Sequence, residues 1–341
     1  MSETLLEVAN LRTTLEVPGG RIRPVDDVSF TLRPGRTLGI VGESGSGKSV
    51  LVRSVMGLLS QRSATRTGSI VLGGQELIGL RGNELRSLWG TTMAMVFQDP
   101  LTSLNPVMRI GSQLDETLRL RLGFGRRQAR ETSAELLRAV GIPDPVKRLR
   151  QYPHELSGGM RQRVCIAIAL AGKPRLLLAD EPTTALDVTV QEQILELLHD
   201  LRTERDLAVV LVTHDLGVVA GEADEVIVMY AGQVVERAPT AALFANVRMP
   251  YTEALLGSIP RVEQPSHTRL TAIAGRPPSF TEMIRGCRFA PRCPYAQDLC
   301  GREPPPLIQS EDPTHWYRCW YPLGEGASGR QPMSSTAGVP D

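Results

Sequence analysis

The sequence predicts an α/β fold whose buried strands end in polar, chemically active residues. Three short apolar runs carry this prediction: residues 38–41 (LGIV), 176–178 (LLL) and 207–212 (LAVVLV). Each run has the length of a buried strand, and each is followed within three residues by glycines or charged side chains. Strand-like and helix-like segments alternate over residues 1–95 and again over 160–235. This alternation is typical of a nucleotide-binding core.

A phosphate-binding motif comes directly after the first run. Residues 42–49 read GESGSGKS and match the pattern G-x-x-x-x-G-K-S. Glycines let the backbone curl so that successive N–H groups point at phosphate oxygens, and the next helix presents its positive dipole end. Lys48 is expected to reach the β and γ phosphates, and the Ser49 hydroxyl to ligate Mg²⁺. A flexible surface loop is the alternative, and the order of strand, complete motif and helix disfavours it. The predicted ATP-binding residues are Gly42, Glu43, Ser44, Gly45, Ser46, Gly47, Lys48, Ser49 and Val50.

Carboxylates at the end of the second run provide a metal anchor and a candidate base. The segment RLLLADEP places Asp180 and Glu181 where that strand ends. Asp180 is expected to hold the Mg²⁺ shell, and Glu181 to orient or polarise an attacking water. His214 follows the third run, at the sheet edge where ligands bind in such folds. An isolated Asp-Glu pair or histidine is more often structural, so these roles depend on the phosphate-binding loop upstream.

A second helix N-terminus suited to bind an anion lies between the phosphate-binding motif and Asp180. Residues 156–160 read LSGGM and open an apolar-periodic helix, with Ser157 as the expected helix cap. The chain already has one phosphate cradle, so a second one suggests contact with a partner's nucleotide. The residues predicted to face the partner's ATP are Leu156, Ser157, Gly158, Gly159 and Met160.

In this order the motifs resemble those of the ABC ATPase family over about the first 240 residues. The resemblance implies a P-loop (RecA-like) nucleotide-binding domain with a helical subdomain at about 96–158, and an ATP-hydrolysing enzyme. It also implies that Glu181 is the catalytic carboxylate, that His214 senses the γ-phosphate and that Gln98 in MVFQDP touches metal and water. The implied Mg²⁺ ligands are Ser49, Gln98 and Asp180.

The resemblance extends to a further motif, and the chain departs from the family pattern at two places. Asp187 closes the D-loop segment TALD, and Met160 stands where many members have glutamine. The family usually stacks adenine on an aromatic residue upstream of the phosphate loop, but here no aromatic residue precedes Phe30. Adenine is then expected to rest on aliphatic or arginine side chains such as Val17 or Ile22, and the sequence leaves this contact unassigned.

Charge and the arrangement of motifs along the chain distinguish between the classes of ABC protein. The 341 residues carry a net charge of +1, which offers no basic stripe for nucleic acid. One P-loop, no internal repeat and no long heptad pattern argue against translation factors, repair proteins and chromosome proteins. The start of the chain does not read as a signal peptide and no apolar run reaches about 20 residues, so a cytoplasmic chain is expected.

Two further segments point to one transporter group. Residues 97–106 (FQDPLTSLNP) and 249–256 (MPYTEALL) resemble segments of the dipeptide, oligopeptide and nickel importer ATPases. The resemblance implies a peptide importer powered at the cytoplasmic face of the inner membrane. Its implied partners are two transmembrane permease subunits, a second and related cassette, and an extracytoplasmic solute-binding protein, without nucleic acid. The alternatives are an importer of nickel or another small solute, a slow redox-sensing cassette and a DNA-repair ATPase. The sequence does not identify the solute.

Four of the five cysteines cluster near the end of the chain. They are Cys287, Cys293, Cys300 and Cys319, in an expected extension over 241–323 that precedes a disordered tail at 324–341. In a reducing compartment such a cluster indicates metal ligands before disulfides. The spacing is looser than that of zinc knuckles and suits a [4Fe–4S] cluster, which the resemblance also implies for some members. Zinc, or no metal at all, are the alternatives. Cys165 is expected to be a core residue.

Overall fold

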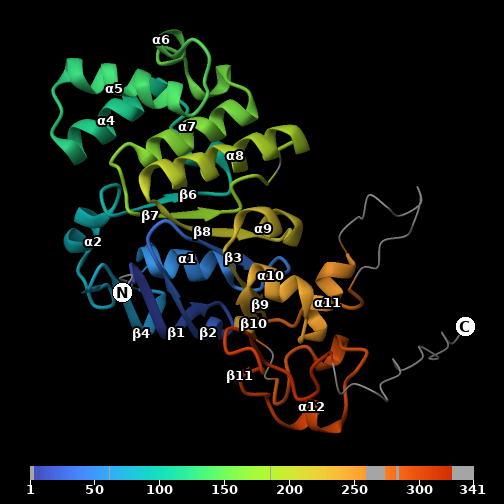
Figure 1. Ribbon diagram of the computed structural model, residues 1–341. Helices are drawn as coiled ribbons and strands as arrows, with labels where there is room; N and C mark the ends of the chain where they lie inside the picture. Colours follow the sequence, from blue (N-terminus) through green and yellow to red (C-terminus); the bar gives the residue numbers. More distant parts are fainter. Residues whose placement is uncertain (1–3, 61, 185, 259–272, 282–283, 325–341) are drawn as a thin grey trace, which may run out of the picture.

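The computed structural model describes residues 4–60, 62–184, 186–258, 273–281 and 284–324. The molecule is built in layers, with helices at one end, a large sheet in the middle and a smaller sheet beside it (Figure 1). The predicted tail at 324–341 lies outside the described residues apart from Gly324, as does Ala185 of the D-loop segment. None of the helices within the described ranges combines the length and the apolar character that crossing a membrane requires.

The large sheet carries the three strands expected from the apolar runs. Its order is β11-β12-β10-β9-β3-β8-β7-β6, and the five strands from β9 to β6 are parallel. Every residue of β3, β7 and β8 is buried, as expected for parallel strands covered on both faces. The strand bounds are β3 Thr37–Val41, β6 Met93–Val96, β7 Leu176–Asp180, β8 Ala208–Thr213, β9 Glu225–Tyr230 and β10 Gln233–Pro239.

The small sheet is antiparallel and encloses the first helix against the large sheet. Its order is β2-β1-β4-β5, and α1 lies between the two sheets (Figure 1). Apolar residues of both sheets and of α1 form one continuous core, which fixes the start of α1 beneath the end of β3. The bounds are β1 Leu6–Val17, β2 Gly20–Leu32, β4 Ala64–Leu72, β5 Gln75–Glu76 and α1 Lys48–Met56.

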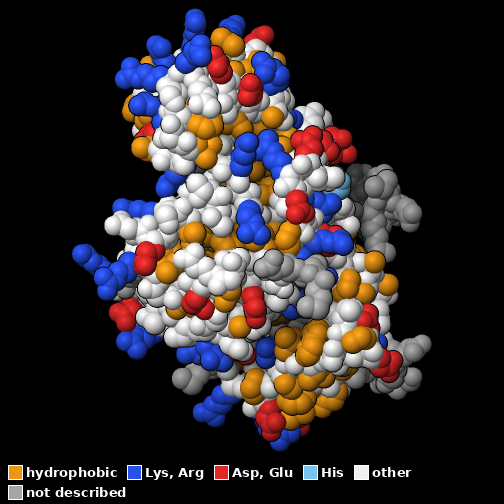
Figure 2. Space-filling view, turned by 60° about the vertical axis from the view of Figure 1, so that its left-hand side comes forward, with side chains coloured by type: hydrophobic (Ala, Val, Ile, Leu, Met, Phe, Trp, Pro, Cys, Tyr) orange, Lys and Arg blue, Asp and Glu red, His pale blue; other side chains and the backbone are white. Residues whose placement is uncertain are grey.

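Most helices between β5 and β9 cover the other face of the large sheet and extend beyond it, whereas the helix at Gly82–Leu88 packs through Leu85 into the core around α1. Helices α4, α5 and α7 pack on one another and on β7 and β8 through a second core, which includes Cys165 as expected. The bounds are α2 Gly82–Leu88, α3 Pro100–Ser103, α4 Ile110–Leu122, α5 Arg126–Ala139, α6 Pro145–Arg148, α7 Gly158–Leu170, α8 Val188–Arg205 and α9 Leu216–Glu222, with a 3₁₀ turn η1 at Pro153–Glu155. Figure 2 shows many Lys and Arg side chains on the surface of this helical end.

The C-terminal region is joined to the large sheet. Strand β12 pairs with β10, and the rings of Tyr230, Tyr251 and Phe289 meet in a third core with centroids 4.5–5.3 Å apart. Glu236 at the centre of β10 is fully buried and bonded to His315 (2.8 Å). The bounds are α10 Thr240–Ala245, α11 Pro250–Gly257, η2 Ala290–Arg292, α12 Asp298–Arg302, β11 Ile308–Gln309 and β12 Trp316–Tyr317.

Candidate active site

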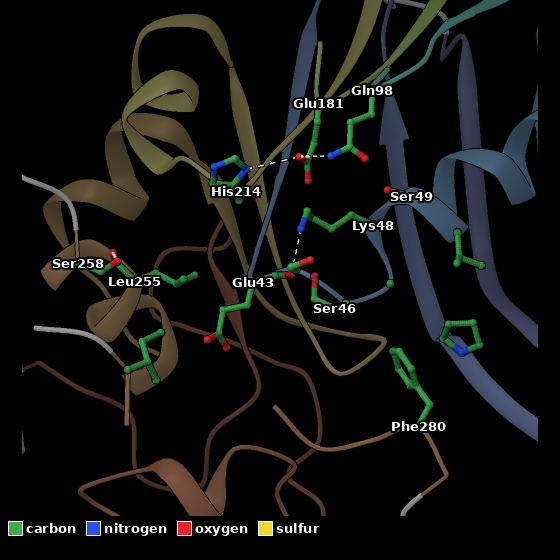
Figure 3. A pocket seen from close by; sticks show the side chains of 16 residues that line it. Glu43, Ser46, Lys48, Ser49, Gln98, Glu181, His214, Leu255, Ser258 and Phe280 are labelled. Atoms are coloured by element: carbon green, nitrogen blue, oxygen red, sulfur yellow. Dashed lines mark hydrogen bonds and ion pairs between the residues drawn. The ribbon is translucent and has the colours of Figure 1, made fainter. Parts of the chain in front are cut away.

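A cavity of about 700 Å³ opens at the carboxyl end of β3, where the phosphate-binding motif turns into α1 (Figure 3). The residues around it come from both sheets, from the helical region and from the C-terminal region. All predicted ATP-binding residues except Gly42 line it, together with Gln98, Glu181 and His214. The complete lining is Pro24, Glu43, Ser44, Gly45, Ser46, Gly47, Lys48, Ser49, Val50, Gln98, Glu181, His214, Leu255, Ser258, Ile273 and Phe280.

The curl of the loop needs glycine at two positions. Gly42 has φ 150°, and a Cβ there would lie 2.2 Å from the carbonyl oxygen of Met229. Gly47 has φ 105°, and a Cβ there would lie 2.0 Å from the carbonyl oxygen of Pro24. Side chains at either position would push the loop out of its cradle shape, because backbone carbonyls cannot give way cheaply.

Lys48 lies in the floor of the cradle. Its ammonium group donates to the carbonyl oxygens of Gly42 (2.7 Å) and Glu43 (3.0 Å), and only 4% of the residue is exposed. Burial lowers the pKa of Lys48, and the nearby carboxylates of Glu181, Asp180 and Glu43 oppose that shift. A buried cation pointing into a polar cavity is suited to neutralise the charge of a bound phosphate chain.

Ser49 and Asp180 form the expected pair of hard oxygen donors. The Ser49 hydroxyl donates to one carboxylate oxygen of Asp180 (2.8 Å), and Asp180 is fully buried at the end of β7. Burial raises the pKa of Asp180, against the Ser49 hydrogen bond and the charge of Arg53. The second oxygen of Asp180 and the hydroxyl of Ser46 have no hydrogen-bond partner. Unsatisfied buried oxygens beside a phosphate cradle fit the needs of Mg²⁺ and its water.

Glu181 is the point at which the remaining predicted residues meet. Its carboxylate accepts from Gln98 (3.0 Å) and from the Thr184 hydroxyl (2.8 Å), and lies 3.5 Å from Nδ1 of His214 (Figure 3). Its backbone is held at φ 50°, in the left-handed region, and its N–H donates to the carbonyl oxygen of Val212 (2.9 Å). Non-glycine residues in this region store strain and cluster at functional sites.

The partner-facing residues lie away from this cavity. Ser157 caps α7 as expected, because its hydroxyl accepts from the N–H of Met160 (3.3 Å). Ser157 and Gly158 are exposed, whereas Leu156 is buried in the helical core and anchors the segment. Asp187 caps α8 by accepting from the N–H of Val190 (3.0 Å). Their contact with a second cassette stays a prediction.

The four C-terminal cysteines line one small apolar cavity of about 10 Å³, together with Met249 and Trp320 among others. Burial raises the pKa of Cys293 to about 11 and that of Cys319 to about 12. However, no set of three or more His, Cys, Asp or Glu side chains in the described ranges lies in an arrangement that could hold a metal ion. The structure therefore gathers the predicted ligands but does not support the metal module expected from the sequence, because the cavity has room for about one water only.

Several residues of the site carried no signal in the sequence. Pro24 of β2 lines the cavity instead of Val17 or Ile22. From the far end of the chain, Phe280 also lines it, and the Tyr251 hydroxyl accepts from the N–H of Glu43 (2.8 Å). Phe280 and Tyr251 lie more than 200 residues downstream of the phosphate loop, so the loop motif itself could not reveal them.

Comparisons with known proteins decide the family. A family model described as "ABC transporter" matches residues 25–184, and one described as "Oligopeptide/dipeptide transporter, C-terminal region" matches residues 235–300. The oligopeptide transport ATP-binding protein OppD of Salmonella typhimurium is 47% identical over 324 residues, which cover 95% of this chain and 96% of that protein. The chain belongs to the ABC transporter family, in its oligopeptide/dipeptide group. The OppD of Bacillus subtilis is 47% identical to this ABC ATPase over 317 residues, covering 93% and 88%.

Solved structures agree on the fold of the nucleotide core. The dimeric structure of the ATP-binding cassette MJ0796, in a post-hydrolysis state bound to ADP and Pi, matches with a TM-score of 0.63 and 28% identity. The match covers 69% of this ABC ATPase and 99% of that chain. CbiO1 from Clostridium perfringens, part of an ABC transporter complex, matches with a TM-score of 0.60 and 25% identity over 71% of this chain and 91% of that one. The predicted P-loop fold and ATPase class are thereby confirmed.

Proposed function

We propose that this ABC ATPase hydrolyses ATP to drive the import of dipeptides or oligopeptides through a membrane complex. The observation that carries the chemistry is the convergence of Gln98, Thr184 and His214 on the Glu181 carboxylate, at one end of the phosphate cradle. The substrate class comes from relatives along nearly the whole chain that are named as oligopeptide transport ATP-binding proteins. The match of the C-terminal region to the oligopeptide/dipeptide model supports the same class.

In this proposal each group at the hydrolytic end has a role. Loop N–H groups and Lys48 are placed to hold the triphosphate, while Ser49, Asp180 and Gln98 would hold Mg²⁺, which neutralises charge on the phosphates when it is bound. Glu181 orients the attacking water, because its carboxylate stands at the cavity wall and is itself fixed by three neighbours. His214 is more than half exposed, so it is free to follow the γ-phosphate.

A second cassette completes the site in this proposal. The exposed Ser157 and Gly158 would present the start of α7 to the nucleotide of the partner, and Asp187 would contact the partner nearby. A related cassette, MJ0796, has been solved as a dimer with ADP and Pi. We propose that this partner is a related second chain, so that the two cassettes form a heterodimer, as the resemblance to the importer ATPases implies.

Exposed apolar side chains next to Gln98 offer a docking surface for a membrane partner. Phe97, Leu101 and Val107 are 38%, 60% and 81% exposed, respectively. Exposed apolar side chains close in sequence to a nucleotide-sensing loop are suited to bind another protein. We assign this surface to one of two permease subunits, which together would hold the ATPase at the cytoplasmic face of the membrane and receive solute from an extracytoplasmic binding protein.

The proposed function is tested in vesicles that contain the chain with its co-purified membrane partners. We expect ATP-dependent uptake of short peptides that requires the solute-binding protein and stops when ATP is omitted. Nickel uptake without peptide uptake would replace the peptide assignment. ATP hydrolysis stimulated by DNA and not by peptide would overturn the transport assignment altogether.

For the cysteine cavity we propose a [4Fe–4S] cluster, with zinc as the alternative. Its support is the shared cavity of four thiols and the preference of iron–sulfur clusters for thiolate donors. Cys287, Cys293, Cys300 and Cys319 would hold it, and binding would require the cavity to widen from its present volume.

Oxygen-free purification is expected to yield about four irons and four sulfides per chain, because each iron of such a cluster takes one cysteine. Changing Cys293 to Ser is expected to lower the iron content severalfold, whereas Cys165→Ser, in the helical core, keeps it. One zinc per chain would favour the alternative, and a chain free of both metals would refute the metal proposal.

A further inference from the structure

The cavity of the nucleotide has two ends of different chemistry. Gln98, Glu181 and His214 line one end, beyond Lys48. Phe280 lies at the opposite end, past the loop that carries Ser46, and its ring is turned toward the cavity (Figure 3). A nucleotide whose phosphates occupy the loop with the γ-phosphate near Glu181 therefore directs its base toward the end formed by Phe280.

The ring of Phe280 is seated against the backbone that supports the phosphate loop. A Cβ on Gly232 would lie 3.2 Å from Cε1 of Phe280, so this glycine leaves room for the ring. The N–H of Gly232 donates to the carbonyl oxygen of Ser46 (2.8 Å), and its carbonyl oxygen accepts from the N–H of Asp26 (2.8 Å). The aromatic ring is thus held beside the loop through one turn between β9 and β10.

Pro24 extends the same end of the cavity from the small sheet. Its carbonyl oxygen lies 2.0 Å from where a Cβ on Gly47 would be, so Pro24 packs directly on the loop. Leu255 also lines the cavity, but on a different side from Phe280 (Figure 3). An apolar end with one aromatic ring, next to a phosphate cradle, has the features of a pocket for a flat base.

We propose that Phe280, from the C-terminal region, is the stacking partner of the nucleotide base. This inference rests on the proposed binding of ATP at the loop and goes beyond it by naming the base contact. It resolves the absence of an aromatic residue upstream of Phe30, because the ring comes from about 230 residues downstream of the loop. Since every base has a π-face, stacking is tolerant of base identity, and ATP and GTP should bind with similar affinity.

The test compares two ligands that share the phosphates but differ in the base. Binding of ATP and of inorganic triphosphate to the full chain is measured by calorimetry without Mg²⁺, so that ATP is not hydrolysed. Phe280→Ala is expected to weaken ATP binding by about 10-fold, because stacking contributes about 1–3 kcal/mol per base. The same change should leave triphosphate binding unaltered, and Phe280→Trp should restore ATP affinity.

The matched control is Tyr317→Ala, which removes a half-buried aromatic ring of the same region outside the cavity. It should change the affinity of neither ligand. Equal weakening of both ligands by Phe280→Ala would mean that Phe280 only supports the loop, and this would overturn the proposal, as would unchanged ATP binding. If the unaltered chain binds neither ligand, the proposed nucleotide site itself fails, which is a distinct result.

Discussion

Replacing Glu181 by Gln is expected to lower ATP hydrolysis by about 100-fold or more while ATP still binds. Glutamine has the size of glutamate, and its amide oxygen can still accept hydrogen bonds from Gln98 and Thr184. The substitution removes the negative charge that orients and polarises the water. Binding of the ATP phosphates depends on Lys48 and the loop, which the substitution leaves unchanged. The measurement is phosphate release by the complex with its membrane partners, beside ATP binding under the same conditions.

Glu222 provides a matched control for Glu181. It is also a partly buried carboxylate beside a histidine, with 3.7 Å to Nδ1 of His199, but it lies on α9 outside the nucleotide cavity. Burial raises the pKa of Glu222, so a neutral Gln is well tolerated there, and Glu222→Gln should hydrolyse ATP at the unaltered rate. If Glu181→Gln hydrolyses ATP at more than about half the rate of the unaltered chain, Glu181 is not the catalytic carboxylate.

The parts of the site that the sequence predicts are those encoded by short, continuous segments. The motif at 42–49 needs only a strand, glycines and a helix in order, and the structure places each of them as expected. Asp180 and Glu181 follow a run that is apolar throughout, so their position at the sheet edge follows from strand length alone. Parallel strands bring these ends together, which is why residues 130 positions apart could be predicted to meet.

The C-terminal contributions were not predictable in the same way. Phe280 lines the cavity, and Tyr251 of the third core contacts the loop at Glu43; nothing in the sequence around either residue resembles a nucleotide motif. The cysteines show the opposite case. Their clustering in the sequence was informative, and they do share a cavity, but ligand geometry depends on side-chain directions that spacing does not determine.

The segment between two of these cysteines connects their cavity to the phosphate loop. Arg288, next to Cys287, donates to the carbonyl oxygen of Ala231 and to Asp26. Arg292, next to Cys293, donates to both carboxylate oxygens of Glu43. The same short stretch that carries two of the thiols therefore carries two cations that contact the nucleotide core.

Arg292→Met is expected to lower the free energy of unfolding by about 1–3 kcal/mol and to weaken ATP binding. The side chain of Arg292 is 4% exposed and donates to Glu43 (2.6 and 2.9 Å), to the carbonyl oxygen of Ala274 (2.8 Å) and to the Tyr230 hydroxyl (3.3 Å). The Glu43 carboxylate raises the pKa of Arg292, so the guanidinium stays charged at every working pH. Removing it leaves Glu43 and the carbonyl of Ala274 without this donor, and Glu43 is 24% exposed, which keeps the loss below that of a fully buried pair.

Urea unfolding of Arg292→Met, Glu43→Gln and the double variant measures the coupling of the pair directly. We expect the double variant to be about 1–2 kcal/mol more stable than the sum of the single losses predicts, because either change alone removes the same interaction. The control is Arg21→Met, whose ion pair with Glu16 is exposed (77% and 59%) and should change stability by less than about 0.5 kcal/mol. Additive losses in the cycle, with ATP affinity unchanged in all three variants, would show that Arg292 merely packs the C-terminal region. A coupled loss with weaker ATP binding would make the C-terminal region a structural part of the nucleotide site.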